Sequence, residues 1–354
     1  IGELTTKVGS GVTPRGGEAV YKTEGHPFVR SQNVGLGNLL LDDIAFIDEE
    51  THLRQKSTEL QFNDVLLNIT GASIGRSALV DKQIVGGNVN QHVCIIRTKE
   101  NLVPSFICSF LLSNYGQRQI DSFQAGGNRQ GLNFEQIKSI KITIPSKDEQ
   151  IKIAKLLRAI DERIATQNKI IDKLQSLIKG IAQNVARNNK PNIRLSECLE
   201  CSSSTLQESD VCKNGTYPVY GANGIVGYLD NYNTEKEAVY IIKDGSGVGT
   251  VSYVTGKCSA TGTLNTLQAK EGYSLQYLYY MLKVFNFEPY KTGMAIPHIY
   301  FKDYGKAKIF CPSYTEQLKY ARLLSAIDNK LSAEQSILTD LSLQKQYLLR
   351  QMFI

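Results

Sequence analysis

The stretch "IPSKDEQIKIAKLLRAID", residues 144–161, returns as "CPSYTEQLKYARLLSAID", residues 311–328. Most positions between 141 and 161 carry the same residue as the position 167 further along the chain. Agreement of this density indicates an internal duplication. Weaker correspondence precedes the two copies, because "GASIGRSALV" (71–80) faces "GSGVGTVSYV" (245–254) and "GGNRQGLNF" (126–134) faces "GMAIPHIYF" (293–301). Each repeat therefore consists of a variable body and a nearly constant tail.

Each tail has the pattern of a long helix. A proline precedes it in both copies, and Ser146 followed by Glu149, or Ser313 by Glu316, has the spacing of a capping box. Apolar residues then recur over about five heptads, which predicts a coiled-coil seam rather than an ordinary surface helix. The seam of the first copy holds Ile153, Leu157, Ile160, Ile164, Ile171, Leu174, Ile178, Ile181 and Val185. The seam of the second copy holds Tyr320, Leu324, Ile327, Leu331, Leu338, Leu341, Leu348 and Met352.

The seam is interrupted at equivalent polar positions, Gln167 in the first copy and Glu334 in the second. If the two helices pair antiparallel, their midpoints meet, and the Gln167 amide can then donate a hydrogen bond to the Glu334 carboxylate. A buried polar pair of this kind lowers stability but penalises slipped registers. The alternative is that both side chains face solvent at a local irregularity.

The two bodies are predicted to be mixed α/β, since short apolar strands alternate with glycine-rich loops and a helix follows the last strand. The first body contains predicted strands at 64–70, 76–80 and 92–98 and a helix at 104–120. The second contains predicted strands at 238–245, 249–254 and 263–269 and a helix at 274–285. The predicted fold class is α+β, with two mixed α/β domains (1–144 and 189–311) joined by two long antiparallel coiled-coil helices (145–188 and 312–354) in a pseudo-twofold internal repeat.

The composition gives no sign of catalytic machinery. A net charge of +6 mildly favours an anionic partner. Seven cysteines, an odd number, argue against a disulfide scaffold and for a reducing cytoplasm. Cys198 and Cys201 lack the second ligand pair that a zinc site needs. The segment "GSGVG" (245–249) resembles a nucleotide-binding loop, but it lies between two predicted strands and is therefore interpreted as a hairpin loop. No apolar run is long enough to span a membrane, and no metal or cofactor site is predicted in this chain.

Glycine-rich polar loops are the candidate binding surface. Arg, Asn and Gln side chains can form paired hydrogen bonds with base edges, while Ser, Thr and backbone amides suit phosphates. In the first body the candidates for DNA contact are Thr13, Arg15, Arg30, Ser31, Gln32, Asn33, Ser73, Arg76, Asn88, Asn90, Gln91, Asn128, Arg129 and Gln130. The second body has no arginine between 195 and 311, and its candidates are Tyr220, Asn223, Lys243, Ser246, Thr261, Asn265 and Lys291.

The whole arrangement resembles the specificity subunit of a Type I restriction-modification system. The likeness rests on the duplicated "P-S-x-x-E-Q-x-x-x-A-x-L-L-x-A-I-D" tails and on the "RSQNV" (30–34) and "GGNRQGLNF" segments. The chain departs from the family pattern at its start, because residues matching 188–194 have no counterpart before Ile1.

The resemblance implies that each body is a target recognition domain for one half of an asymmetric, bipartite site in double-stranded DNA. It also implies that the helices act as a spacer and dock two methyltransferase subunits, which bring S-adenosylmethionine, and that motor-nuclease subunits join the full complex. The chain itself is then non-catalytic.

Two other functions fit parts of the pattern. A coiled-coil scaffold whose bodies bind proteins would show no preference between DNA sequences. A methyltransferase in its own right would need the Asp/Asn-Pro-Pro-aromatic motif of amino-methylating enzymes, and the chain has no Pro-Pro.

Overall fold

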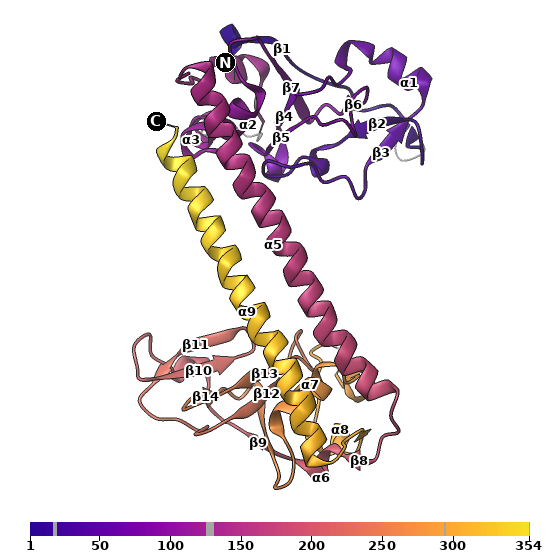
Figure 1. Ribbon diagram of the computed structural model, residues 1–354, viewed down its shortest axis with the longest axis vertical. Helices are drawn as coiled ribbons and strands as arrows, with labels where there is room; N and C mark the ends of the chain where they lie inside the picture. The colour runs from indigo at the N-terminus through magenta and orange to yellow at the C-terminus, as the bar shows by residue number, and fades with distance from the viewer. Residues whose placement is uncertain (17–19, 125–130, 294, 354) are drawn as a thin grey trace. The chain divides into compact units, whose positions relative to one another are not determined.

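The computed structural model of the chain describes residues 1–16, 20–124, 131–293 and 295–353. It divides into two compact units (Figure 1). Unit 1 comprises residues 1–168 and 337–354, and unit 2 comprises residues 169–336. Each unit therefore contains one body together with parts of both tail helices. The boundaries predicted from the repeat, at 144, 188 and 311, follow the sequence pattern and remain a prediction.

Unit 1 is built on two sheets. The larger has the strand order β1-β7-β4-β5, formed by Thr5–Ser10, Val93–Thr98, Val65–Asn68 and Ser77–Leu79. All its neighbours are antiparallel. The smaller has the order β3-β2-β6, formed by Ala45–Ile47, His26–Val29 and Asn88–Val89. In it β2 is antiparallel to β3 and parallel to β6.

Unit 2 repeats this plan strand for strand. Its larger sheet has the order β13-β12-β15-β9, again antiparallel throughout, formed by Val251–Val254, Ala238–Ile242, Leu264–Ala269 and Leu199–Ser203. Its smaller sheet has the order β11-β10-β14, formed by Gly224–Leu229, Tyr217–Gly221 and Ser259–Ala260. In it β10 is antiparallel to β11 and parallel to β14. A short pair, β8 (Ile193–Arg194) with β16 (Lys308–Ile309), adds to this unit. The duplication thus extends through bodies that share little sequence, which confirms the predicted mixed α/β repeat.

Short helices connect the strands. Unit 1 contains α1 (Glu49–Arg54), α2 (Pro104–Leu112), α3 (Asn114–Ser122) and α4 (Phe134–Ser139). Unit 2 contains α6 (Leu195–Cys198), α7 (Leu275–Lys283) and α8 (Phe301–Tyr304). Single 3-10 turns lie at Gly2–Leu4, Ser31–Asn33, Lys56–Thr58, Gly71–Ser73, Glu208–Asp210 and Glu288–Tyr290. The loop at 245–249 joins the antiparallel strands β12 and β13, as predicted for a hairpin.

The helix predicted at 104–120 is wrong as a single element, because α2 ends at Leu112 and α3 starts at Asn114. Ser113 between them has an extended backbone, with ψ at 160°, and its hydroxyl accepts a hydrogen bond from the Gly116 backbone N–H. A Cβ on Gly116 would lie 2.2 Å from the Phe110 carbonyl oxygen, so the chain turns back tightly here. The serine cap and the glycine contact therefore override the apolar periodicity.

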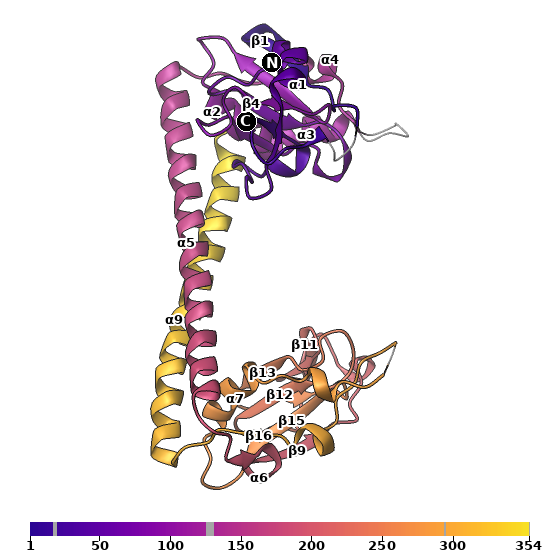
Figure 2. The same ribbon diagram turned by 90° about the vertical axis from the view of Figure 1, so that its right-hand side faces the viewer.

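The core of unit 1 lies between the larger sheet and helices from both repeats. Sheet residues such as Leu67 and Ile96 pack in one cluster with Phe106 and Phe110 of α2. The same cluster contains Leu157 from the first tail helix and, from the C-terminal end of the chain, Leu349 and Phe353. The opposite face of the sheet packs on the smaller sheet in a second cluster. The C-terminal end of the chain is thus part of the first body's core (Figures 1 and 2).

The tail helices are α5 (Lys147–Arg187) and α9 (Tyr314–Gln351). Within unit 1, Ile153 lines a cavity together with Met352 and Phe353. Two turns further along α5, the Asp161 carboxylate lies 2.5 Å from the Lys345 ammonium. As the residue number rises along α5, that of its neighbour in the second tail falls. The two segments in unit 1 are therefore antiparallel, as predicted.

The polar seam positions Gln167 and Glu334 are both buried, with 8% and 6% of their surface exposed. Burial contradicts the alternative in which both face solvent. Glu334 also forms an ion pair with Lys330, one turn earlier on α9. A hydrogen bond between Gln167 and Glu334 stays a prediction.

The repeated "EQ" dipeptide attaches each tail helix to its body. The Ser146 hydroxyl and backbone N–H both bond the Glu149 carboxylate, at 2.7 and 3.1 Å, and Ser313 bonds Glu316 in the second copy. The next residue, Gln150, is 1% exposed. Its amide oxygen accepts from the Val103 N–H at 2.9 Å, and its amide nitrogen donates to the Pro145 carbonyl at 3.1 Å.

Gln317 makes the equivalent bonds in unit 2. Its side chain is 2% exposed, accepts from the Ser274 N–H and donates to the Pro312 carbonyl, both at 2.9 Å. Val103 and Ser274 are the N-caps of α2 and α7. A buried glutamine therefore fixes the start of each tail helix to the start of the helix that covers the sheet.

Replacing Gln150 by Leu should lower the free energy of unfolding of unit 1 by about 1–3 kcal/mol, because a buried N–H of Val103 loses its acceptor. Thermal and urea unfolding of the full chain measures the change. Gln344→Leu is the matched control, since Gln344 is an exposed residue of α9 in the same unit. Equal effects of the two substitutions would contradict the assigned role of Gln150.

Candidate nucleic-acid interface

In each unit, equivalent loops meet at one end of the two central strands of the larger sheet. In unit 1 the Ile69 N–H donates to the His92 carbonyl at 3.0 Å, and the Leu132 N–H donates to the Ile69 carbonyl at 2.9 Å. In unit 2 the Lys243 N–H donates to the Thr263 carbonyl at 3.0 Å, and the Ile299 N–H donates to the Lys243 carbonyl at 2.9 Å. We call these two places the loop junctions.

Isolated bridges add to the correspondence between the two loop junctions. Thr70 pairs with Gly131 in unit 1, and Asp244 pairs with His298 in unit 2. Gly131 and Leu132 are therefore the equivalents of His298 and Ile299 in the repeat, as the alignment of 126–134 with 293–301 predicted. The predicted contact residues Asn128, Arg129 and Gln130 belong to this segment but lie outside the described residues.

Asn68 holds the junction of unit 1 together. Its side chain is fully buried at the end of β4, and its amide nitrogen donates to the Ser31 carbonyl at 2.8 Å and to the Ser73 hydroxyl at 3.1 Å. Two of the predicted loop segments, 29–35 and 70–76, are thereby brought together. Arg76 is exposed beside them. Sequence reasoning did not single out Asn68, because a buried strand end gives no binding signal.

The "RSQNV" segment is organised around one carboxylate, that of Asp43. Arg30 donates to the Asp43 carbonyl at 2.7 Å and Gln32 donates to its carboxylate. Asn33 donates to the same carboxylate at 2.9 Å. The Arg30 guanidinium also lies 5.4 Å from the centre of the Tyr21 ring. These polar side chains therefore stabilise the loop in the chain as it stands.

Five predicted contact residues are buried, which revises the expectation that their side chains meet DNA directly. They are Asn33, Asn88, Asn90, Thr261 and Asn265. Asn90 accepts from the His92 N–H at 3.0 Å, the Thr261 and Thr263 hydroxyls are 2.9 Å apart, and Asn265 accepts from the Ser203 hydroxyl at 2.7 Å. Composition could not separate the side chains that support a loop from those on its surface.

The remaining candidates reach the surface at least in part. Those exposed are Thr13, Arg15, Gln32, Arg76, Gln91, Asn223 and Ser246. Those half-buried are Arg30, Ser31, Ser73, Tyr220, Lys243 and Lys291. Lys291 is paired with Glu288 at 2.5 Å and lines a different cavity from Lys243, so the structure does not bring these two lysines together.

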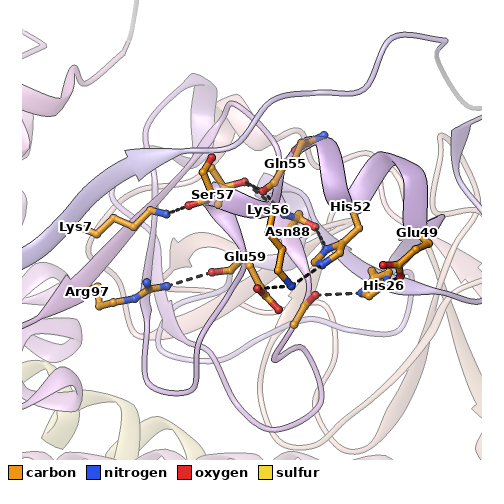
Figure 3. Close-up of polar contacts among 12 residues, drawn as sticks. Lys7, His26, Glu49, His52, Gln55, Lys56, Ser57, Glu59, Asn88 and Arg97 are labelled. Carbon is orange, nitrogen blue, oxygen red and sulfur yellow. Dashed lines mark hydrogen bonds and ion pairs between the residues drawn. The ribbon is translucent and has the colours of Figure 1, made fainter.

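A histidine pair that sequence reasoning missed anchors α1 to the smaller sheet of unit 1 (Figure 3). The rings of His26 and His52 are stacked, with centroids 3.8 Å apart and planes 4° apart. Asn88 donates through its amide nitrogen to the Gln55 carbonyl, so its oxygen accepts from Nδ1 of His52 at 2.7 Å. This bond fixes the proton of His52 on Nδ1 and explains why Asn88 is buried.

His26 faces an acceptor at each ring nitrogen. Nε2 lies 2.6 Å from the Glu49 carboxylate and Nδ1 lies 3.3 Å from the Gly86 carbonyl (Figure 3). The hydrogen bond between Nε2 of His26 and the Glu49 carboxylate lowers the pKa of Glu49 below its ordinary value. The two histidines are 26 residues apart in sequence and belong to no local motif, so no sequence pattern indicates their contact.

A cavity of about 420 Å³ lies at the loop junction of unit 2. It brings together two predicted residues, Lys243 and Asn265. Residues that sequence reasoning missed complete what we call the cationic pocket: Cys201, Ser203, Asp244, His298, Ile299, Tyr300, Phe301 and Lys302. Nδ1 of His298 lies 2.6 Å from the Asp244 carboxylate. The contributing residues come from β9, β15, α8 and two loops, so only the fold places them together.

Within the described ranges, no group of three or more His, Cys, Asp or Glu residues is arranged to hold a metal ion. Cys198 and Cys201 are free thiols, and burial raises the pKa of Cys198 to about 12. No helix among the described residues is long and apolar enough to cross a membrane.

Comparison with known proteins gives a consistent result. A protein of Mycoplasma genitalium described as a putative type I specificity subunit is 25% identical over 320 residues, covering 82% of this chain and 81% of its own length. The EcoKI specificity subunit of Escherichia coli is 23% identical over 197 residues, covering 52% of this chain and 40% of its own length.

Solved structures share the fold. The crystal structure of the Type I restriction-modification S subunit from M. genitalium superposes with a TM-score of 0.69 at 18% identity, covering 99% of this chain and 94% of the other. A structure of a type I R-M system assembly gives a TM-score of 0.56 at 17% identity, covering 98% of this chain and 95% of the other.

The sequence profile described as "Type I restriction modification DNA specificity domain" matches residues 1–176 and again 191–342. These two matches cover most of the chain and coincide with the two repeats. The chain therefore belongs to the family of Type I restriction-modification specificity subunits and carries two copies of its specificity domain.

Proposed function

We propose that each body reads one half of an asymmetric, bipartite site in double-stranded DNA, while the tail helices set the spacing of the halves and dock methyltransferase subunits. One observation carries the proposal. The two bodies share strand order and loop-junction hydrogen bonds, but their loops carry different side chains. Two domains with the same strand arrangement but different loop side chains are suited to recognise two different DNA sequences.

The chain is a non-catalytic subunit, because its homologues are specificity subunits and the catalytic activity of these systems lies in other subunits. S-adenosylmethionine would accordingly bind to the methyltransferase subunits. Motor-nuclease subunits would join the same complex for cleavage. These partners act in the cytoplasm, where the host DNA lies.

The chemistry of the exposed loops supports DNA as the ligand. In unit 1, Arg15, Arg76 and Gln91 are exposed and can bond guanine or adenine edges in the major groove. Asn128, Arg129 and Gln130 belong to the same proposed surface. In unit 2 the exposed or half-buried candidates are Tyr220, Asn223, Lys243, Ser246 and Lys291, so that lysine takes the place of arginine.

Repeated apolar residues on the tail helices support docking of one kind of partner twice. Leu156 and Leu323 are equivalent in the repeat and are 44% and 51% exposed. Ile170 and Ile337 are likewise equivalent and are 36% and 40% exposed. Apolar side chains kept on the surface at matching positions are typical of an interface.

The direct test expresses the chain with its methyltransferase partner in a host that lacks modified adenine, followed by sequencing of modified bases. We expect one motif with two unlike halves and a fixed gap, because one chain carries two different readers. Cells without this chain are the control. Modification without a bipartite motif, or binding that is indifferent to DNA sequence as for a scaffold, would contradict the proposal.

Lengthening both tail helices by one heptad should widen the gap in the recognised motif. Seven helical residues add about 10 Å, which corresponds to about three base-pair steps. Replacing seven exposed residues without insertion is the control. An unchanged gap in the lengthened protein, measured by the same base sequencing, would show that the helices do not set the spacing.

Leu156→Glu and Leu323→Glu should together weaken binding of the methyltransferase subunits by about tenfold or more, since each leucine loses its apolar contact. Mass photometry of the mixed subunits measures this. Leu343→Glu is the matched control, because Leu343 is 58% exposed on α9 but its equivalent in the first repeat is Ser176. If Leu343→Glu disrupted assembly as strongly, the repeated positions would not be the docking sites.

A further inference from the structure

We propose that the cationic pocket of unit 2 binds a phosphodiester group of the DNA backbone in the half-site that unit 2 reads. The inference rests on the proposed function and deepens it. It assigns Lys243 and Lys302 to phosphate contact and makes Tyr300 the neighbouring surface on which the nucleotide lies.

The charges of the pocket select an anion. Lys243 and Lys302 both line it, and among the described residues neither ammonium has a carboxylate within ion-pair distance. The carboxylate of Asp244 is occupied by His298, 2.6 Å away. The lining therefore holds two lysines against one carboxylate, and this excess of positive charge favours a phosphate ligand.

Tyr300 gives the pocket an aromatic edge. It is 48% exposed, its ring is stacked on that of His298 at 6.5 Å and 22°, and the Lys302 ammonium lies 5.3 Å from its ring centre. An exposed aromatic ring beside cations can pack against the sugar next to a bound phosphate on a DNA duplex. The hydrogen bond from His298 to Asp244 fixes the other side of this stack.

Hydrogen bonds hold two parts of the pocket lining in place, the Asn265 side chain and the Lys243 backbone. Asn265 is only 4% exposed and accepts from the Ser203 hydroxyl at 2.7 Å. The backbone of Lys243 is fixed on both sides, by the Thr263 carbonyl and by the Ile299 N–H. The lysine is therefore presented from a fixed position, which lowers the entropy lost on binding.

The residues that would contact the ligand favour phosphate over a base edge. Lysine offers only donors, and it binds phosphate as a point charge. The amide of Asn265, which could read a base, lies beneath the pocket with its oxygen already bonded. The pocket thus positions unit 2 on DNA, and sequence is read by other residues.

The pocket is specific to unit 2. The shared hydrogen bonds make Ile69 the equivalent of Lys243, and the shared bridge makes Gly131 the equivalent of His298. At the repeat offset, Glu135 stands where unit 2 has Lys302. Among the described residues, unit 1 therefore has no counterpart of Lys243 or Lys302 at its loop junction, so the proposed phosphate contact belongs to unit 2.

The test measures binding of the chain, assembled with its methyltransferase subunits, to a duplex carrying the motif found by base sequencing. In the double variant Lys243→Met/Lys302→Met, the slope of log affinity against log salt should fall in magnitude by about 0.9, the value for one phosphate. Discrimination between bases in either half-site should be unchanged. Lys283→Met, an exposed lysine of α7 outside the pocket, is the matched control and should leave the slope unchanged.

A second arm locates the contact. Single methylphosphonate substitutions, which neutralise one phosphate, are scanned along the half-site of unit 2. At one position the neutral linkage should weaken the wild-type protein but leave the double variant unaffected. Thermal unfolding of each variant checks that the fold is intact.

An unchanged salt slope in the double variant, or a changed base preference in either half-site, would overturn the assignment. If the wild-type complex still binds its motif specifically, the proposed function is unaffected by that result. Failure of the wild-type complex to prefer any duplex would instead reject the proposed function itself, and the assignment with it.

Discussion

The core of unit 1 is closed by side chains from the far end of the chain. Phe353 packs between Phe106 and Phe110, with ring centroids 5.2 and 5.9 Å away, and Leu349 joins the same cluster. The first body therefore completes its core only when the second tail lies antiparallel to the first. This requirement explains why the two tail helices are similar in sequence while the bodies differ. Each tail helix must attach to its own body through Gln150 or Gln317. The core of unit 1 must in addition accommodate the tail helix of the second repeat.

The bodies combine a fixed frame with variable loops. The frame consists of the same strand order and the same pair of backbone hydrogen bonds at each loop junction. Within it, unit 1 presents arginine and glutamine, whereas unit 2 presents lysine and an aromatic ring around a cavity. Because backbone bonds hold the frame, loop side chains can change without cost to the sheet, and a duplicated chain can acquire two recognition surfaces.

Much of this fold was predictable from local patterns. Heptads, capping boxes and short apolar strands each depend on neighbours in sequence, and α5, α9, β4, β5, β7, β12, β13 and β15 lie where these patterns placed them. The other strands, such as β1, β2 and β10, were not predicted. The break at Ser113 was missed because it depends on a close contact of Gly116. The site was less predictable, since burial decides whether an asparagine such as Asn88 supports a loop or meets a ligand. The stacked histidines and the cationic pocket bring together residues that are distant in sequence, so no local sequence pattern predicts these two features.

The most direct test of the account is hydrogen–deuterium exchange in the full chain carrying Phe353→Ala. If the C-terminal end completes the core of unit 1, exchange should rise in α2 and in the first half of α5, while strands β12 and β15 of unit 2 stay protected. Tyr347→Ala, which alters an aromatic residue that is 62% exposed on α9, should leave both units as they are. Unchanged protection of α2 in Phe353→Ala, or equal loss of protection in both units, would contradict the claim.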